Sequence, residues 1–292
     1  MASQTEKPVG EDATRNGTSP NDARLKWPKT IAHALTKPGK RFRVLRGGRG
    51  SLKTSAAAFF AASYGMTCAK NGKSGVILCC REFLRSLDDS SMVEVKAAIA
   101  SDPELAAFYE VGEKFIRTRC RRVEFSFAGL RHNLESLKSR AKILLCWVDE
   151  AEAVMESAWV KLLPTVIRHP DSELWVTYNP ERRDSPTNKR FFLKPPKNSV
   201  VVTVNWNNNP FFHNTALPEQ MESDRQIMDA ATFDWVWNGQ YLERSDKQVF
   251  GDKYRVDEFE PAASWDGPYY GGDFGFANDP TAAVKVWIYG ER

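Results

Sequence analysis

A glycine-rich segment, GGRGSLKT, occupies residues 47–54 and follows a short apolar run. Gly47, Lys53 and Thr54 fit the GxxxxGK[ST] pattern of phosphate-binding loops, whereas Leu52 stands where the second glycine is expected. In such loops backbone N–H groups turn toward phosphate oxygens, the lysine reaches the β- and γ-phosphates, and the hydroxyl ligates Mg²⁺. The segment predicts a site for ATP and Mg²⁺, and a glycine-rich turn without a ligand is the alternative. The predicted nucleotide-binding residues are Gly47, Gly48, Arg49, Gly50, Ser51, Lys53 and Thr54.

Leu52 affects the expected nucleotide affinity of this loop. A side chain is strained where the backbone needs positive φ, so leucine at this position predicts an altered loop or weaker affinity.

Two carboxylates follow the most apolar segment of the chain. Ile143–Val148 is followed directly by Asp149 and Glu150, as expected of a buried strand that delivers acidic side chains to a nucleotide site. Asp149 would hold Mg²⁺, and Glu150 would polarise the water that attacks the γ-phosphate. The pair therefore predicts hydrolysis as well as binding. Its separation from Lys53 suits ATPases that insert a strand between the two motif strands, while an ordinary strand ending in a solvated acidic pair is the alternative.

A third polar motif, LWVTYNP at residues 174–180, ends another predicted strand. A polar side chain at this place can sense the γ-phosphate and report its loss to a moving segment. Asn179 is the candidate for this role, and a simple Asn-Pro turn is the competing interpretation.

Strand-like and helix-like segments alternate along the chain, which predicts an α/β fold with a mostly parallel, doubly wound sheet. The predicted strands are 42–45, 75–80, 143–148, 173–178 and 200–206, with a hairpin in 115–127. The predicted helices are 53–70, 87–100, 133–139, 156–167, 217–231 and 232–240. After residue 245 the composition changes, and two strands joined by a polar turn are expected. We expect a flexible tail at 1–24, an ATPase domain at 25–245 and a separate C-terminal part at 246–292.

Composition excludes several classes of protein. With 292 residues, a formal charge of +4 and 42% hydrophobic residues, the chain is globular, and any basic surface must be local. Its five cysteines form no CxxC pair and its four histidines are scattered, so free buried thiols are expected and zinc is not. No apolar stretch is long enough to span a membrane and the first residues are too polar for a secretory signal, which predicts a soluble protein in a reducing compartment.

Taken together and in order, five segments resemble the ATPase domain of the large terminase subunit of tailed bacteriophages. They are GGRGSLKT, CREFLRSLDDS, LLCWVDEAEAV, LWVTYNP and VTVNWNNNPFF, and the resemblance covers about residues 41–245. It implies a P-loop NTPase of the ASCE type that hydrolyses ATP to drive double-stranded DNA into a procapsid through the portal. Arg49 and Lys53 would contact phosphates, Glu150 would be the catalytic base, and the segment containing Asn179 would couple hydrolysis to DNA movement.

The resemblance also implies partners and a location. They are double-stranded DNA, the portal protein, the small terminase subunit and further copies of the chain in a ring, in the host cytoplasm and away from membranes. Arg140 is a candidate for an arginine that completes a neighbour's site, and a solvated charge run is the alternative. Arg81 and Glu82 lie where the family has a nucleotide-proximal segment, although a surface ion pair is equally compatible with the sequence.

The family's C-terminal half is a nuclease of RNase H type that uses two Mg²⁺ or Mn²⁺ ions. YYGGDFGFANDP resembles its opening strand, with Asp273 as a metal ligand. One carboxylate cannot hold two metal ions, so we expect only the first strands of this domain and no DNA cleavage by the chain alone.

Two other functions stay open at this stage. One is another P-loop DNA motor such as a helicase, and the other is a non-hydrolysing DNA-binding assembly protein whose phosphate loop Leu52 has disabled. Two basic clusters could meet DNA or only solvate a surface. They are Arg117, Arg119, Arg121 and Arg122, and Arg182, Arg183, Lys189 and Arg190.

Overall fold

The structure is a computed structural model that describes residues 27–83, 91–131, 142–242, 258–275 and 281–289. The predicted tail at 1–24, the predicted helix at 133–139 and Arg140 lie outside these residues. The chain divides into two compact units, Met1–Glu243 and Arg244–Arg292.

The first unit is built on an eight-stranded sheet with the order β3-β4-β5-β2-β6-β7-β1-β8. The strands are β1 (Phe42–Arg46), β2 (Gly75–Arg81), β3 (Tyr109–Val111), β4 (Ile116–Thr118), β5 (Val123–Gly129), β6 (Ile143–Val148), β7 (Glu173–Tyr178) and β8 (Ser199–Thr203). Pairing is parallel from β5 to β8 and antiparallel among β3, β4 and β5. The predicted α/β fold with a mostly parallel sheet is confirmed, and β7 is the predicted strand inserted between β1 and β6.

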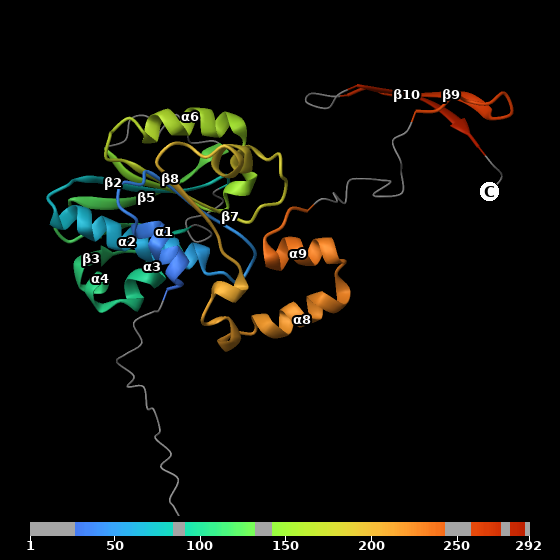
Figure 1. The fold of residues 1–292 in the computed structure, drawn as a ribbon. Helices are drawn as coiled ribbons and strands as arrows, with labels where there is room; N and C mark the ends of the chain where they lie inside the picture. Colours follow the sequence, from blue (N-terminus) through green and yellow to red (C-terminus); the bar gives the residue numbers. More distant parts are fainter. Residues whose placement is uncertain (1–26, 84–90, 132–141, 243–257, 276–280, 290–292) are drawn as a thin grey trace, which may run out of the picture. The chain divides into compact units, whose positions relative to one another are not determined.

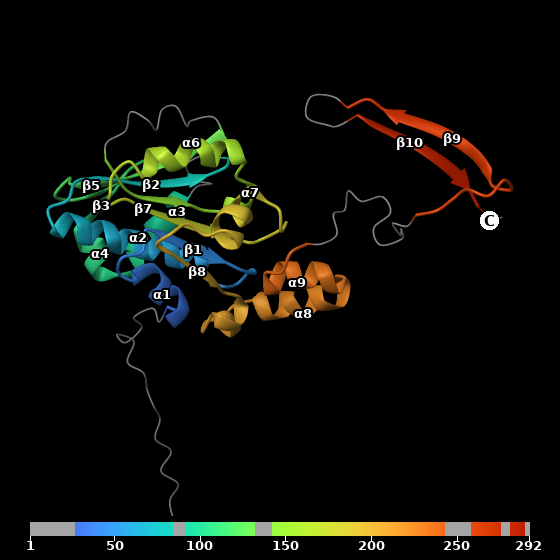
Figure 2. The ribbon, with the colours of Figure 1, turned by 45° about the horizontal axis from the view of Figure 1, so that its top comes forward.

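Helices cover both faces of this sheet (Figure 1). Their bounds are α1 (Lys29–Thr36), α2 (Lys53–Lys70), α3 (Ser91–Ser101), α4 (Pro103–Phe108), α6 (Glu156–Val166), α7 (Pro186–Asn188), α8 (Leu217–Ile227) and α9 (Ala230–Asn238). Short helical turns are η2 (Ala151–Ala153), η3 (Lys189–Leu193), η4 (Trp206–Asn208) and η5 (Phe212–Asn214). Figure 2 shows α6 on one face and α1, α2, α3 and α4 on the other.

Alternation along the strands builds two separate cores. On β6, Leu145 and Trp147 pack with the α2 side, whereas Cys146 and Val148 pack with the α6 side. Both faces are therefore buried, as expected for the central strand of a parallel sheet. A third, smaller cluster around Phe212 and Trp237 joins η5 to α8 and α9.

Several element boundaries differ from those expected. The helix predicted at 87–100 is described from Ser91 to Ser101, and the helix boundary predicted between residues 231 and 232 falls earlier, because Asp229 caps the N-terminus of α9 through Ala231 N–H and Thr232 N–H. Helices α1 and α4 and strand β3 were not predicted. In the second unit, β9 (Asp266–Asp273) and β10 (Ala282–Ile288) form the antiparallel pair expected from the sequence.

Candidate nucleotide-binding site

The glycine-rich loop connects the end of β1 to the start of α2, which is the position that a phosphate-binding loop requires. Leu52 immediately precedes α2 with φ 64° and ψ 17°, in the left-handed region. An L-residue pays about 1–2 kcal/mol for this conformation. The loop therefore keeps the backbone path that glycine favours, and the cost is steric strain at Leu52.

Gly47 and Gly48 serve close packing. A β-carbon on Gly47 would lie 1.9 Å from the carbonyl oxygen of Val204, and one on Gly48 would lie 2.1 Å from that of Trp237. The Gly48 N–H donates to Asn205 Oδ1 at 2.8 Å, so the beginning of the loop is fixed to the segments after β8 and at the end of α9.

The second half of the loop presents amides for an anion. Arg49 N–H donates to the Val236 carbonyl at 2.8 Å, whereas the amides of Gly50, Ser51 and Leu52 have no protein acceptor within the described part of the chain. They lie just before the N-terminus of an 18-residue helix, whose dipole favours negative charge. This arrangement fits a phosphate group.

Lys53 is buried and folds back onto the loop. Its Nζ donates to the carbonyls of Gly47 and Gly48 at 2.9 and 2.7 Å, and to Ser51 Oγ at 2.9 Å. Burial lowers the pKa of Lys53 from 10.5 to about 7, against an opposing effect of the Asp149 carboxylate. The amine is thus held next to the loop carbonyls rather than in solvent.

Asp149 is the centre of a buried polar network at the carboxyl ends of the strands. Thr54 Oγ1 and Thr177 Oγ1 both donate to Asp149 Oδ1, at 3.1 and 2.7 Å. The Trp147 indole donates to Thr177 Oγ1 at 2.9 Å, which fixes the orientation of that hydroxyl. Asp149 is only 1% exposed, so its carboxylate is held in one position by these contacts.

Arg81, at the end of β2, forms ion pairs with both predicted acidic residues, Asp149 and Glu150. Its guanidinium lies 2.7 Å from Asp149 Oδ2 and 3.5 Å from Glu150 Oε1. Of the two interpretations of Arg81, the structure supports a place beside the acidic pair. The Glu150 side chain is 69% exposed, and its backbone takes the strained left-handed conformation at φ 51°. A solvent-facing carboxylate, that of Glu150, therefore lies next to the buried, fixed carboxylate of Asp149.

Asn179 lies directly after β7, half-buried, at the same edge of the sheet. The carbonyl of the preceding Tyr178 accepts from Gly47 N–H at 3.3 Å, which joins the end of β7 to the loop. Asn179 therefore follows a strand that contacts both the loop and, through Thr177, the acidic residue Asp149.

The residues present fit a nucleotide-bound Mg²⁺. A hydroxyl oxygen of Thr54 and a carboxylate of Asp149 are adjacent, and Mg²⁺ in nucleotide sites prefers one or two such oxygens together with phosphates and water. Among the described residues, no group of three or more His, Cys, Asp or Glu side chains could hold a metal ion without such a partner.

Sequence reasoning missed three residues that shape the site. Thr177 orients Asp149, Asn205 accepts from Gly48 N–H, and Asn209 Nδ2 donates to the Gly50 carbonyl at 2.8 Å. The asparagine-rich run after β8 was a visible signal for two of them. Asp273, by contrast, lies at the end of β9 in the second unit and is exposed.

The remaining sequence expectations concern thiols and membranes. All five cysteines are free, with Cys68, Cys79, Cys80 and Cys146 buried and Cys120 exposed. Burial raises the pKa of the Cys79 and Cys146 thiols well above the usual value. No helix in the described ranges is both long and apolar enough to cross a membrane.

Comparison with solved structures supports the P-loop fold. The large terminase of the thermophilic bacteriophage D6E aligns with a TM-score of 0.62 at 15% identity, covering 90% of this chain and 65% of that one. The same terminase in complex with ADP aligns with a TM-score of 0.60. The HK97 bacteriophage large terminase gives 0.57 at 14% identity, covering 74% of this chain and 50% of that one. The ATPase domain of the Thermus phage P74-26 large terminase aligns with a TM-score of 0.50 at 14% identity, covering 72% of this chain and 92% of that one.

Sequence comparison identifies the family. No curated protein matches the chain. A family model described as phage terminase large subunit matches residues 39–257, most of the chain. The chain belongs to the phage terminase large subunit family.

Proposed function

We propose that this chain is the ATP-hydrolysing subunit of a motor that packages viral double-stranded DNA. The observation that carries the proposal is the meeting of Lys53, Thr54, Asp149 and Glu150 at one helix N-terminus and one sheet edge. A cation, a metal-ligating hydroxyl, a buried carboxylate and an exposed carboxylate are the groups that phosphoryl transfer to water needs. Membership of the terminase family and the ADP complex of the D6E terminase support the same activity.

Each residue has a role that follows from its position. Lys53 exchanges the loop carbonyls for the β- and γ-phosphates, and the amides of Gly50, Ser51 and Leu52 donate to phosphate oxygens. Thr54 and Asp149 would hold Mg²⁺. When bound, Mg²⁺·ATP supplies the electrophilic γ-phosphate with its charge neutralised. Glu150 accepts the proton of the attacking water, and Arg81 positions both carboxylates before the reaction.

The conformation of Leu52 argues against a disabled phosphate loop. A leucine that blocked the loop would force another backbone path, whereas Leu52 takes the left-handed conformation and leaves the adjacent amides without protein acceptors in the described residues. This favours a hydrolysing enzyme over a non-hydrolysing assembly protein. A helicase would share these features, and strand unwinding by the purified chain would favour it.

Steady-state ATP hydrolysis by the full chain tests the proposal. We expect slow Mg²⁺-dependent turnover that Glu150→Gln reduces by about 100-fold or more, with nucleotide binding retained, since a positioned general base contributes about 10²–10⁴-fold. Lys53→Ala should lose binding and turnover together. Glu156→Gln, an exposed substitution of the same type on α6, is the matched control and should leave turnover unchanged. Absence of turnover even with portal protein and DNA present would refute the proposal and favour the assembly protein.

The partners follow from the family and are proposals for this chain, which spans 65% of the D6E terminase. They are double-stranded DNA, the portal protein, the small terminase subunit and further copies of the chain in a ring, in the host cytoplasm. Arg140 stays the candidate for an arginine acting on a neighbour's site. Asp273 stays the candidate ligand for a nuclease metal, Mg²⁺ or Mn²⁺, in the second unit.

A further inference from the structure

Positively charged residues precede most strands of the parallel part of the sheet, at the edge opposite the nucleotide site. Parallel strands begin at a common edge, so residues just before them are neighbours in space although they are distant in sequence. We name this set the basic strip. Its members are Lys40, Lys73, Arg121, Arg122, Lys142, Arg168 and Lys197.

Backbone hydrogen bonds show that the members of the basic strip lie side by side. Gly75 N–H donates to the Arg122 carbonyl at 2.9 Å, and Val76 N–H donates to the Lys142 carbonyl at 2.8 Å. These bonds place Arg122 and Lys142 on either side of the start of β2.

Hydrogen bonds also connect the strip residues that precede β7, β1 and β8. Arg41 N–H donates to the Asn198 carbonyl at 2.9 Å, which places Lys40 and Lys197 next to each other. The Arg41 guanidinium donates to the carbonyls of Ile167 and His169, on both sides of Arg168. From β5 to β8 the strip spans about 24 Å, at about 4.8 Å per strand.

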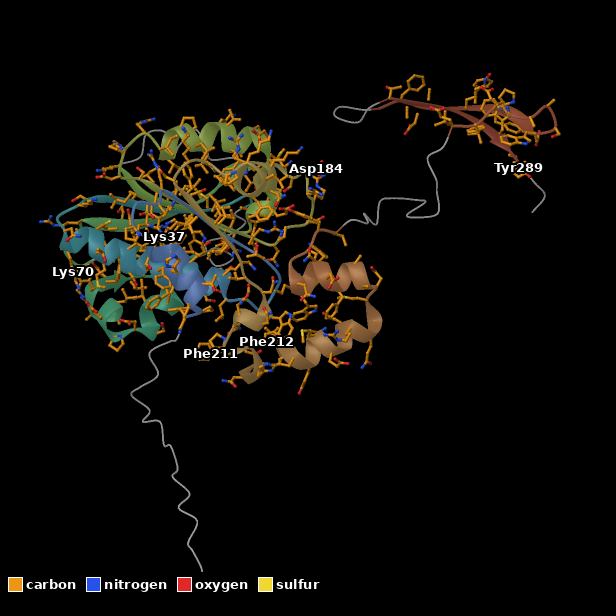
Figure 3. The ribbon with its side chains drawn as sticks, in the orientation of Figure 1. Lys37, Lys70, Asp184, Phe211, Phe212 and Tyr289 are labelled. Atoms are coloured by element: carbon orange, nitrogen blue, oxygen red, sulfur yellow. The ribbon has the colours of Figure 1, made fainter. Side chains whose placement is uncertain are left out.

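The charge of the strip is exposed and only weakly neutralised. All members are exposed except the half-buried Lys40. Asp171 lies 3.5 Å from Lys73, in a pair whose side chains are both about half exposed, so the attraction is screened. Lys70, at the end of α2, is paired with Glu104 and is not counted in the strip. Figure 3 shows Lys70 at the side of the first unit away from Asp184 and Phe212.

We propose that the basic strip binds the phosphate backbone of duplex DNA. The choice of DNA as the ligand rests on the proposed function, whereas the location of the binding surface rests on the positions of the strip residues. Protein partners need buried aromatic or aliphatic anchors at the centre of an interface, whereas nucleic-acid interfaces are polar and basic. Among the described residues, Ile167 is the exposed large hydrophobic residue that directly adjoins a strip member in the sequence, Arg168. A row of cations without apolar anchors fits a regular polyanion and carries no feature that reads bases.

The strip and the nucleotide site lie at opposite edges of the sheet. A strand of six residues, such as β6, is about 20 Å long at about 3.3 Å per residue. DNA on the strip therefore leaves the loop at 47–54 accessible to ATP. Loss of DNA binding and loss of ATP hydrolysis can then be separated by substitution.

The test measures binding of the full chain to a fluorescent 30-base-pair duplex between 50 and 200 mM salt. The strip variant replaces Lys73, Arg121, Arg122 and Lys142 by alanine. We expect its affinity to fall by more than about tenfold, and the slope of log K against log salt to fall by about 2–4 units, since each phosphate contact contributes about 0.9. ATP turnover without DNA should be unchanged, which separates this proposal from the proposed function.

A variant with the same change in charge is the control. It replaces Arg182, Arg183, Lys189 and Lys194, all exposed and outside the strip, by alanine. Affinity within about twofold of the parent chain supports the proposal. An equal or larger loss in this control would overturn it, because the effect would then come from net charge or from the second cluster. Two double variants, Arg121→Ala with Arg122→Ala and Lys73→Ala with Lys142→Ala, should each give a partial loss and guard against misfolding of the fourfold variant.

Cys120 offers a second readout without substitution. It is the only exposed thiol of the five cysteines and lies between Arg119 and Arg121. A hydrogen bond with Thr118 is the main cause that lowers the pKa of Cys120, which favours the reactive thiolate. Bound duplex should slow alkylation of Cys120 by several-fold, and excess polyglutamate should not. Equal alkylation rates with and without saturating DNA would contradict the proposed location, and protection by polyglutamate alone would indicate an acidic protein partner instead.

Discussion

Nucleotide binding should take up a proton at Lys53, and the amount is set by the lowered pKa of this residue. Burial in the phosphate loop lowers the pKa of Lys53 to about 7. A phosphate beside Nζ raises the pKa of Lys53 again, because an opposite charge within about 4–6 Å favours the ammonium form. Binding therefore converts a partly neutral amine into a fully charged one.

The size of the uptake depends on pH in a way that can be calculated. With a pKa near 7, the free site carries about 0.1 proton at pH 8 and about 0.9 at pH 6, so binding should take up about 0.9 and 0.1 proton respectively. By linkage, the association constant should fall about eightfold per pH unit above pH 8 and be nearly independent of pH below pH 6.

Isothermal titration calorimetry with Mg²⁺·ADP in buffers of different ionisation enthalpy measures this uptake directly. Lys53→Arg is the matched control, because a guanidinium stays charged over the whole range and should take up almost no proton. An uptake below about 0.3 proton at pH 8 in the parent chain, or the same uptake in Lys53→Arg, would refute the assignment of the proton to Lys53.

Three further outcomes are expected. Leu52→Gly should change the free energy of unfolding by no more than about 1 kcal/mol, since relief of strain at positive φ offsets the added entropy of the unfolded chain. Leu52→Val should destabilise the protein clearly, because β-branched residues tolerate positive φ poorly. A lower urea midpoint for Leu52→Gly than for Leu52→Val would contradict this reasoning. Thr177→Val should lower the free energy of unfolding by about 1–3 kcal/mol, because it leaves the buried Trp147 indole N–H without an acceptor and removes one of the donors to Asp149. The exposed Thr67→Val is the control in the same denaturation assay. Plasmid incubated with the chain and Mg²⁺ or Mn²⁺ should stay uncut, and cleavage that Asp273→Ala abolishes would show this expectation to be wrong.

The central elements of the fold could be predicted because their sequences carry one unambiguous signal each. Ile143–Val148 is apolar throughout and is buried on both faces as β6, and Lys53–Lys70 is rich in alanine and forms α2 with the expected bounds. The two motif strands were expected to have one strand between them, and that strand is β7, which follows β6 in the chain.

Other parts of the site depend on contacts that no local pattern encodes. Arg81 could be a surface ion pair or a partner of Asp149 on sequence grounds, and only the adjacency of β2 and β6 decides between them. The role of Thr177 depends on the indole of Trp147 on a neighbouring strand. Such cross-strand pairs join positions far apart in the chain, so residue type and spacing alone do not specify them.

The glycines of the phosphate loop show how a motif can be right for an unexpected reason. Gly47 and Gly48 are both predicted to bind phosphate, yet their missing side chains make room for the carbonyls of Val204 and Trp237. The position before Lys53, where the pattern asks for glycine, holds Leu52 in the left-handed conformation instead. A β-carbon at Gly47 or Gly48 would lie about 2 Å from a backbone carbonyl, so a larger residue there would have to move the segment after β8 or the end of α9. A glycine favoured only by its φ angle can be replaced at a cost of about 1–2 kcal/mol. In this loop packing requires glycine at 47 and 48, whereas the position before Lys53 tolerates a leucine because only conformational strain opposes it.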